Sequence, residues 1–236
     1  MTSTQFIRLL RESSAPLLGD GAMGTMLHAH GAGFEQCFDA LNLSHPDWVS
    51  KIHQAYMLAG SQVIQTNTFG ANRYKLTNHG LEDQLDAINR AGVELVQQAI
   101  QATNQKVWIA GDVGPLGVRL APFGRVQPEQ ARQVFAEQIQ ALHQASADLI
   151  ILETFSDLYE IREALAAAHQ VCNLPMVASM TFTRDDRTVL GDSPAKVALG
   201  LHAAGADVIG INCSGGPAQL WRIIRQMRQA VPTALF

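Results

Sequence analysis

The chain has 236 residues, of which 47% are hydrophobic and 16% charged, and its formal net charge is −4. That length and composition are enough to bury the core of one large domain. The acidic balance, without any cluster of Lys or Arg, argues against nucleic-acid binding. No apolar run approaches the ~20 residues of a membrane span, and the N-terminus lacks the pattern of a secretory signal. Three widely spaced cysteines form no disulfide framework, which is typical of a cytoplasmic protein.

Short apolar runs alternate with amphipathic stretches along the chain. Each run ends at a polar residue or a glycine, and each predicts a strand. The runs cover residues 15–19, 62–65, 106–110, 149–152, 176–180 and 208–211, and residues 232–236 read as the start of a seventh. Near-continuous apolar strands that alternate with helices predict an α/β fold with parallel strands covered by helices.

Several helix starts can also be read from the sequence. The segment SHPD at 44–47 predicts a capping box with a proline in the first turn, and this helix should close at Gly60. Prolines at positions 128, 194 and 217 mark later helix starts. Residues 85–99 keep one face apolar at the helical period, which predicts a further helix.

No linker or low-complexity tract divides the chain, so we expect one domain over residues 1–236. Two architectures fit this pattern: an open doubly wound sheet and a (β/α)8 barrel. A barrel usually needs about 250 residues. Because the chain ends inside the predicted seventh strand, we expect such a barrel to be truncated within strand 7 and to lack its last strand–helix units.

The segment GDGAMG at 19–24 matches the G-x-G-x-x-G fingerprint of dinucleotide binding. The fingerprint requires a second strand that ends in an acidic residue about 20 residues later. Here the second predicted strand comes about twice as late and ends in Thr66-Asn67, and Asp20 places a carboxylate where a pyrophosphate would approach. We therefore favour a tight turn with its backbone close to a ligand, and an NAD(P)-dependent oxidoreductase is an alternative.

Polar side chains follow the predicted strands. In parallel α/β folds, ligands bind beyond the carboxyl ends of the strands. These positions carry carboxylates, amides, hydroxyls and one thiol, with no Lys or Arg among them: Asp20, Thr66, Asn67, Asp112, Glu153, Thr154, Thr181, Asn212 and Cys213. Such a rim suits a ligand with a cationic amine and does not suit a phosphate.

The individual residues differ in how much they indicate. Glu153 points most clearly to function, because a carboxylate that closes an apolar run is costly to bury without a partner. Asp20 and Asp112 could each simply accept hydrogen bonds from loop amides. Cys37 and Cys172 lie away from the strand ends, and we expect them to be structural.

Five segments in this order resemble the homocysteine S-methyltransferase family: LGDGAMGT at 18–25, IQTNTFGA at 64–71, GDVGP at 111–115, ETFSD at 153–157 and GINCS at 210–214. The stretch from Lys75 to Asp83 is also similar to cobalamin-dependent methionine synthases and to bacterial fusions with a methylenetetrahydrofolate reductase. The resemblance implies a (β/α)8 barrel and a methyltransferase that converts homocysteine to methionine.

The resemblance also implies how the substrate is held. Asp20 and Glu153 match carboxylates that bind the amino group of homocysteine. Thr66 and Asn212 match polar residues of the same pocket. Backbone amides around Gly21 would receive the substrate carboxylate.

Cys213 matches the first of three cysteines that bind zinc in this family. The other two belong to a Gly-Gly-Cys-Cys-Gly segment at strand eight, which this chain does not contain. Zinc held by three thiolates leaves a fourth position for the homocysteine sulfur, which would react as the thiolate. We therefore expect this chain alone to be inactive or nearly so, as part of a zinc-dependent enzyme. The alternative is a non-catalytic amino-acid-binding protein of the same fold.

The methyl donor is not fixed by these residues. Relatives use methylcobalamin, methyltetrahydrofolate, S-methylmethionine or betaine, and we rank betaine lowest because aromatic residues make up only 6% of the chain. The expected partners are homocysteine and a methyl donor or a donor-carrying domain. Unpaired strand edges also predict a homo-oligomer.

Overall fold

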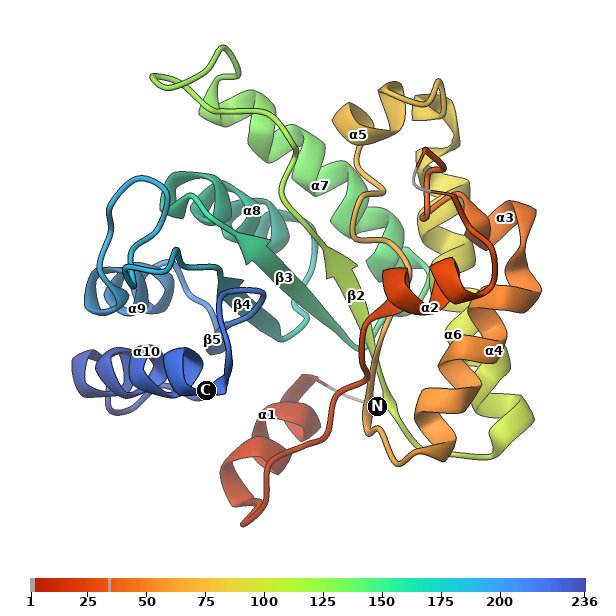
Figure 1. Ribbon diagram of the computed structural model, residues 1–236, viewed down its shortest axis with the longest axis horizontal. Coiled ribbons are helices and arrows are strands. Elements are labelled where there is room, and N and C mark those ends of the chain that lie inside the picture. Colours follow the sequence, from red (N-terminus) through yellow and green to blue (C-terminus); the bar gives the residue numbers. More distant parts are fainter. Residues whose placement is uncertain (1–2, 34) are drawn as a thin grey trace.

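The computed structural model describes residues 3–33 and 35–236 (Figure 1). Five parallel strands form one sheet in the order β1-β2-β3-β4-β5. They are β1 (Val63–Gln65), β2 (Trp108–Val113), β3 (Leu149–Phe155), β4 (Met176–Met180) and β5 (Val208–Ile211). This order follows the chain without a reversal, as along the wall of a barrel, whereas a doubly wound sheet reverses at a switch point. The doubly wound alternative is therefore excluded for the described residues.

The helices are α1 (Ser3–Glu12), α2 (Met23–Ala29), α3 (Leu41–Ser44), α4 (Pro46–Leu58), α5 (Arg73–Thr77), η1 (Glu82–Gln84), α6 (Leu85–Thr103), α7 (Pro128–Gln144), α8 (Leu158–Val171), α9 (Pro194–Ala203) and α10 (Pro217–Ala230). Helices α4 and α6 to α10 pack on the outer face of the sheet, whereas α1 precedes the strands (Figure 1). Over the described ranges, none of the helices has the length and apolarity to span a lipid bilayer.

The predicted prolines do stand at helix starts, in the first turn of α4, α7, α9 and α10. The capping box predicted at 44–47 is wrong. Ser44 is the last residue of α3, and its hydroxyl faces the carbonyl of Ala40 (3.3 Å) and the ring of His45 (3.0 Å), so it does not cap α4. A capping box is found instead at the start of α7, between Gln127 and Gln130.

The segments 15–19 and 232–236, predicted as the first strand and the start of the seventh, pair with the sheet but are not full strands. Each segment meets the sheet at one parallel bridge only, Gly19 with Val63 at one edge and Leu235 with Val208 at the other. Each segment has a neighbouring strand on one side alone. Its backbone therefore lacks the second set of inter-strand hydrogen bonds that the inner strands make. The two bridges nevertheless place them at the edges where they were expected.

The strand β3 is longer than predicted and includes Glu153 and Thr154. Its register against β4 shifts between Leu152 and Phe155, and Thr154 has a positive φ of 60°. Irregularities of this kind re-aim a side chain at the end of a strand. This local geometry sets the direction of Glu153 at the carboxyl end of the sheet.

The two faces of the sheet have different coverings. Ile150 and Leu152 pack toward the outer helices, whereas Leu149 packs on the inner face. There α1, which the sequence analysis did not predict, places Phe6 edge-on against Trp108 with 5.1 Å between the ring centroids. Because α1 packs at the inner face near the start of β2, the ligand-accessible end is the one at the carboxyl ends of the strands.

Candidate functional site

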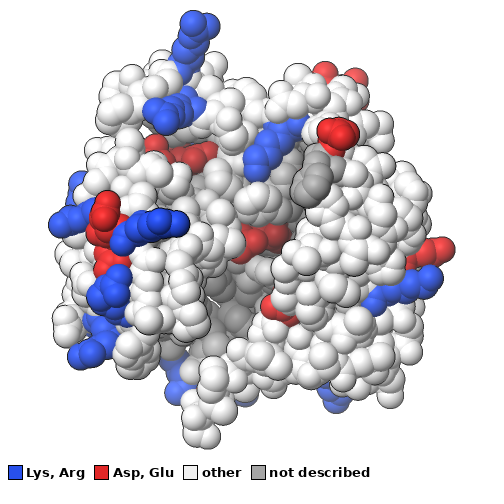
Figure 2. Space-filling model, viewed as in Figure 1, with Lys and Arg blue, Asp and Glu red and all other residues white. Residues whose placement is uncertain are grey.

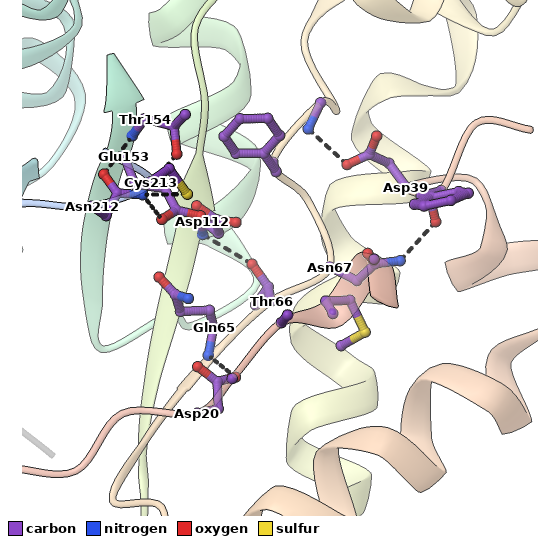
Figure 3. A pocket seen from close by; sticks show the side chains of 17 residues that line it. Asp20, Asp39, Gln65, Thr66, Asn67, Asp112, Glu153, Thr154, Asn212 and Cys213 are labelled. Carbon is purple, nitrogen blue, oxygen red and sulfur yellow. Dashed lines mark hydrogen bonds between the residues drawn. The ribbon is translucent and has the colours of Figure 1, made fainter. Parts of the chain in front are cut away.

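A cavity of about 610 Å³ opens at the carboxyl ends of the strands (Figure 3). Acidic side chains are visible in a hollow at the middle of the face shown in Figure 2. All six residues expected to form the site line this one cavity: Asp20, Gly21, Thr66, Glu153, Asn212 and Cys213. They come from the turn before α2 and from the ends of β1, β3 and β5, so the fold brings together residues that are far apart in the sequence.

Asp20 is fixed by the neighbouring strand. Its carboxylate Oδ2 accepts a hydrogen bond from the main-chain N–H of Gln65 at 2.9 Å. Its Oδ1 is buried and has no hydrogen-bond partner among the described residues. Burial raises the pKa of Asp20 to about 7, the bond from Gln65 opposes this rise, and the charge of Glu153 adds to it. The free site therefore holds a carboxylate that is costly to charge until a cation arrives.

Gly21 lies where a neighbouring side chain comes very close. A Cβ at this position would be 2.8 Å from the hydroxyl of Tyr56. That hydroxyl donates a hydrogen bond to the carbonyl of Ala22 at 3.2 Å. Only glycine fits beside Tyr56 without displacing its ring. Because Gly21 has no side chain, the backbone of this turn is open to the cavity.

Glu153 and Cys213 are joined through Asn212. The Nδ2 of Asn212 donates to Glu153 Oε2 at 2.6 Å and to Thr154 Oγ1 at 2.7 Å, and it lies 3.5 Å from Cys213 Sγ. Its Oδ1 accepts a hydrogen bond from the main-chain N–H of Thr154 at 2.9 Å. Burial raises the pKa of Glu153. One amide thus connects a carboxylate of β3 to the thiol that follows β5.

Thr66 lines the cavity, but its hydroxyl bonds within the protein. Its Oγ1 lies 2.6 Å from Thr68 Oγ1 and accepts a hydrogen bond from the main-chain N–H of Asp112 at 3.0 Å. Since the hydroxyl of Thr68 donates to the carbonyl of Asp112 at 2.7 Å, Thr66 is the donor to Thr68. Thr66 therefore holds β1 and β2 in register at the cavity floor.

Asp112 contributes a third carboxyl group to the cavity, although the family resemblance did not place it among the substrate-binding residues. Its side chain is buried, and its Oδ1 has no hydrogen-bond partner in the described part of the chain. Burial raises the pKa of Asp112 well above its usual value, and the charges of Glu153, Asp39 and Asp20 act in the same direction. The sequence indicated this role only through the position of Asp112 near the carboxyl end of β2.

Asp39 and Lys75 were also missed. Asp39 is buried in the cavity wall, where its Oδ1 accepts a hydrogen bond from the main-chain N–H of Gly70 at 2.8 Å, and burial raises its pKa. The Nζ of Lys75 lies 4.3 Å from the ring centroid of Phe69, and burial lowers its pKa. No strand end carries a cation in the sequence, but the structure brings Lys75 of α5 close to the acidic groups.

The loop at 66–71 forms one wall of the cavity and is held by buried amides from three helices. Asn42 of α3 donates to the carbonyl of Asn67 at 2.8 Å. Asn89 of α6 donates to the carbonyl of Ala71 at 2.8 Å, and Gln138 of α7 donates to that of Thr68 at 2.7 Å. These bonds fix the wall in place before any ligand binds.

The described residues do not fit a complete zinc site. Residues 3–33 and 35–236 contain no group of three or more His, Cys, Asp or Glu side chains that could hold a metal ion. Cys213 is exposed at the cavity and supplies one sulfur, whereas Cys172 is buried and Cys37 is half-buried, and neither lines the cavity. One thiol is too few for the three protein ligands that a catalytic zinc ion takes.

The family model of homocysteine S-methyltransferase matches residues 17–236, and the chain belongs to this family. It is 28% identical over 229 residues to the methionine synthase of Mycobacterium tuberculosis and 26% identical over 225 residues to that of Mycobacterium leprae. These matches cover 91% and 89% of this chain but 19% of each relative, so the chain spans about one fifth of the length of these enzymes.

Solved structures show the same fold. The metallated form of the homocysteine methyltransferase MmuM from Escherichia coli matches with a TM-score of 0.81 and 24% identity, covering 95% of this chain and 83% of that one. The carboxyl transferase domain of Rhizobium etli pyruvate carboxylase with pyruvate matches less well, with a TM-score of 0.56 and 13% identity, covering 98% of this chain and 37% of that one. The chain therefore has the α/β fold of the homocysteine methyltransferases.

Proposed function

We propose that this chain is the homocysteine-binding module of a zinc-dependent methyltransferase, in which Asp20 and Glu153 bind the substrate ammonium group. The observation that carries the proposal is the cavity itself, where these two carboxylates face the same space as Cys213. The buried Asp20 Oδ1 lacks a donor within the described chain, and an ammonium group would supply one. A charged hydrogen bond of this kind is among the stronger polar contacts.

In the proposed reaction the homocysteine thiol first gives its proton to solvent, and the resulting thiolate attacks a methyl carbon of the donor, whose electron pair leaves with the donor. The new S–C bond forms as the bond between the methyl group and the donor breaks, and methionine results. Asp20 and Glu153 orient the substrate and take no proton in this displacement. Main-chain N–H groups around Gly21 bind the substrate carboxylate, and compounds without an amine are rejected because the acidic groups then remain unpaired.

The metal enters the proposal only through Cys213. We assign this thiol as one zinc ligand, with the remaining ligands outside residues 1–236, and we expect the chain alone to be inactive. Residues 1–236 form one domain of barrel type, to which further strand–helix units are added at the edges marked by Gly19 and Leu235. The donor is methylcobalamin or methyltetrahydrofolate, or a domain that carries one of them.

Calorimetric titration tests the substrate assignment. L-homocysteine is expected to bind at least about 10-fold more tightly than 4-mercaptobutanoate, which lacks only the amino group, because one charged contact contributes about 1.5–3 kcal/mol. Equal affinity for the two thiols would rule out the ammonium site. Methionine formation from methylcobalamin, assayed with the longer protein that supplies the remaining zinc ligands, separates the catalytic module from the alternative: a non-catalytic amino-acid-binding protein would form none.

A further inference from the structure

The side chain of Asn212 is already engaged within the protein. Both Nδ2 hydrogens have acceptors, Glu153 Oε2 at 2.6 Å and Thr154 Oγ1 at 2.7 Å, and Oδ1 accepts from the N–H of Thr154 at 2.9 Å (Figure 3). A primary amide has two donor hydrogens and one carbonyl oxygen. Asn212 therefore has no donor left for a ligand, although it lines the cavity.

The same amide connects two residues with unfavourable backbone conformations. Thr154 has a φ of 60° and Cys213 a φ of 48°, and both fall in the left-handed region that non-glycine residues avoid. For a β-branched residue such as Thr154 this is a genuine outlier. Conformations of this kind persist only where the surrounding contacts hold them, and they concentrate at functional sites.

Further hydrogen bonds fix the backbone on the Cys213 side. The hydroxyl of Thr181 donates to the carbonyl of Cys213 at 3.0 Å. The hydroxyl of Ser214 donates to the carbonyl of Asn212 at 3.2 Å and accepts from the N–H of Phe182 at 2.8 Å. The segment that carries Asn212 is thereby anchored to the end of β4, so its amide can hold Glu153 and Thr154 from a fixed position.

We propose that Asn212 is a positioning residue: it sets the Glu153 carboxylate and the Cys213 thiol at a fixed separation, and it does not contact the substrate. This inference rests on the proposed function, which assigns Glu153 to the substrate ammonium group. The side chain at position 212 must donate hydrogen bonds to the Glu153 carboxylate and the Thr154 hydroxyl. It must at the same time accept one from the main-chain N–H of Thr154. Aspartate cannot donate to Glu153 and would repel it, and alanine offers none of the three bonds.

A double-mutant cycle tests the proposal on the 236-residue chain. The affinities of L-homocysteine and 4-mercaptobutanoate are measured for wild type, Asn212→Ala, Glu153→Gln and the double variant. Asn212→Ala is expected to reduce the preference for homocysteine about 10-fold and to leave the affinity for the analogue nearly unchanged. The double variant should lose no more preference than Glu153→Gln alone, because Asn212 acts through Glu153.

Gln97→Ala is the control, since Gln97 of α6 is a half-buried amide that donates to the carbonyl of Ala145 at 3.1 Å and does not line the cavity. It should lower the melting temperature without changing the preference between the two ligands. The proposal is overturned if Asn212→Ala lowers the affinities for both thiols by the same factor. It is also overturned if, in the double variant, the losses of homocysteine preference caused by Asn212→Ala and Glu153→Gln are additive.

Hydrogen exchange of the main-chain N–H of Thr154 tests the contact without any ligand. The bond to Asn212 Oδ1 should protect this N–H in wild type and in Gln97→Ala, and Asn212→Ala should accelerate its exchange at least about 10-fold. An unchanged rate contradicts the positioning role. If wild type does not distinguish the two thiols, the substrate assignment fails, while the exchange rate still decides whether Asn212 holds Thr154.

Discussion

One carboxyl oxygen of Asp20 is bound to the main-chain N–H of Gln65, and the other points into a buried space without a partner among the described residues. This bond ties the turn before α2 to the end of β1. The open oxygen of Asp20 is therefore presented in a fixed direction before a ligand binds.

Asp20→Asn should weaken homocysteine binding about 10- to 100-fold, because it removes a charged partner of the ammonium group. Calorimetry at pH 8 measures the effect. Asp86→Asn is the control, since Asp86 lies on the exposed side of α6 and pairs with Arg90 there. Equal losses for both variants would show that the effect is not specific to the cavity.

Homocysteine should bind more tightly as the pH rises from 6 to 8. The pKa of Asp20 in the free protein is about 7, and the group must lose its proton to pair with an ammonium ion. Binding at pH 6.5 should therefore release protons, which calorimetry in two buffers of different ionisation enthalpy detects. Tighter binding at pH 6 than at pH 8 would contradict this assignment.

Asp112→Asn should stabilise the free protein at pH 8. Burial raises the pKa values of Asp112 and Asp20, so between about pH 4 and pH 7 the native state binds more protons than the unfolded state, and the free energy of unfolding falls as the pH rises. Removing a buried carboxylate whose Oδ1 has no partner among the described residues recovers about 1–3 kcal/mol. The melting temperature should rise by a few degrees at pH 8 and much less at pH 4; a decrease at pH 8 would show that the charged form is paired.

Phe6→Ala should destabilise the chain by about 3–5 kcal/mol, as for other buried aromatic residues. Phe6 is 3% exposed and packs on Trp108, whereas Leu9 of the same helix is 38% exposed. Urea unfolding of Phe6→Ala and of the control Leu9→Ala separates the loss of buried packing from the general effect of an alanine substitution on this helix, where alanine is itself a strong helix former. Similar small effects would mean that α1 contributes little to the inner face of the sheet.

The 236-residue chain should retain no stoichiometric zinc after dialysis against a chelator, because among the residues that the structure describes Cys213 is the one thiol that lines the cavity. Metal analysis by mass spectrometry measures this directly. Cys213→Ser should then leave the metal content unchanged. One tightly bound zinc per chain, lost in Cys213→Ser, would refute the proposal that further ligands lie outside this chain.

The inner strands and the residues at their ends could be predicted because the sequences of buried parallel strands are continuous apolar runs. The runs at 176–180 and 208–211 match β4 and β5. Asp20, Glu153 and Cys213 follow such runs, and parallel strands bring their ends to one edge. The prolines at helix starts were visible because proline fits the first turn, where no N–H is needed.

Other features depend on tertiary contacts that no local pattern encodes. Asp39 lies in an irregular stretch and becomes part of the cavity wall only through Gly70, 31 residues later. Lys75 approaches the acidic groups because α5 folds back over Phe69. The role of Ser44 was misjudged because its hydroxyl bonds to the carbonyl of Ala40 and to the ring of His45, on either side of α3.

The buried amides of Asn42, Asn89 and Gln138 have a thermodynamic consequence for the loop at 66–71. Conformational entropy that a free loop would lose on association has already been lost when the chain folds. This wall needs no rearrangement when a ligand enters the cavity, so association should be fast. The affinity should then depend mainly on how well contacts between the ligand and the carboxylates replace the water that each loses on binding.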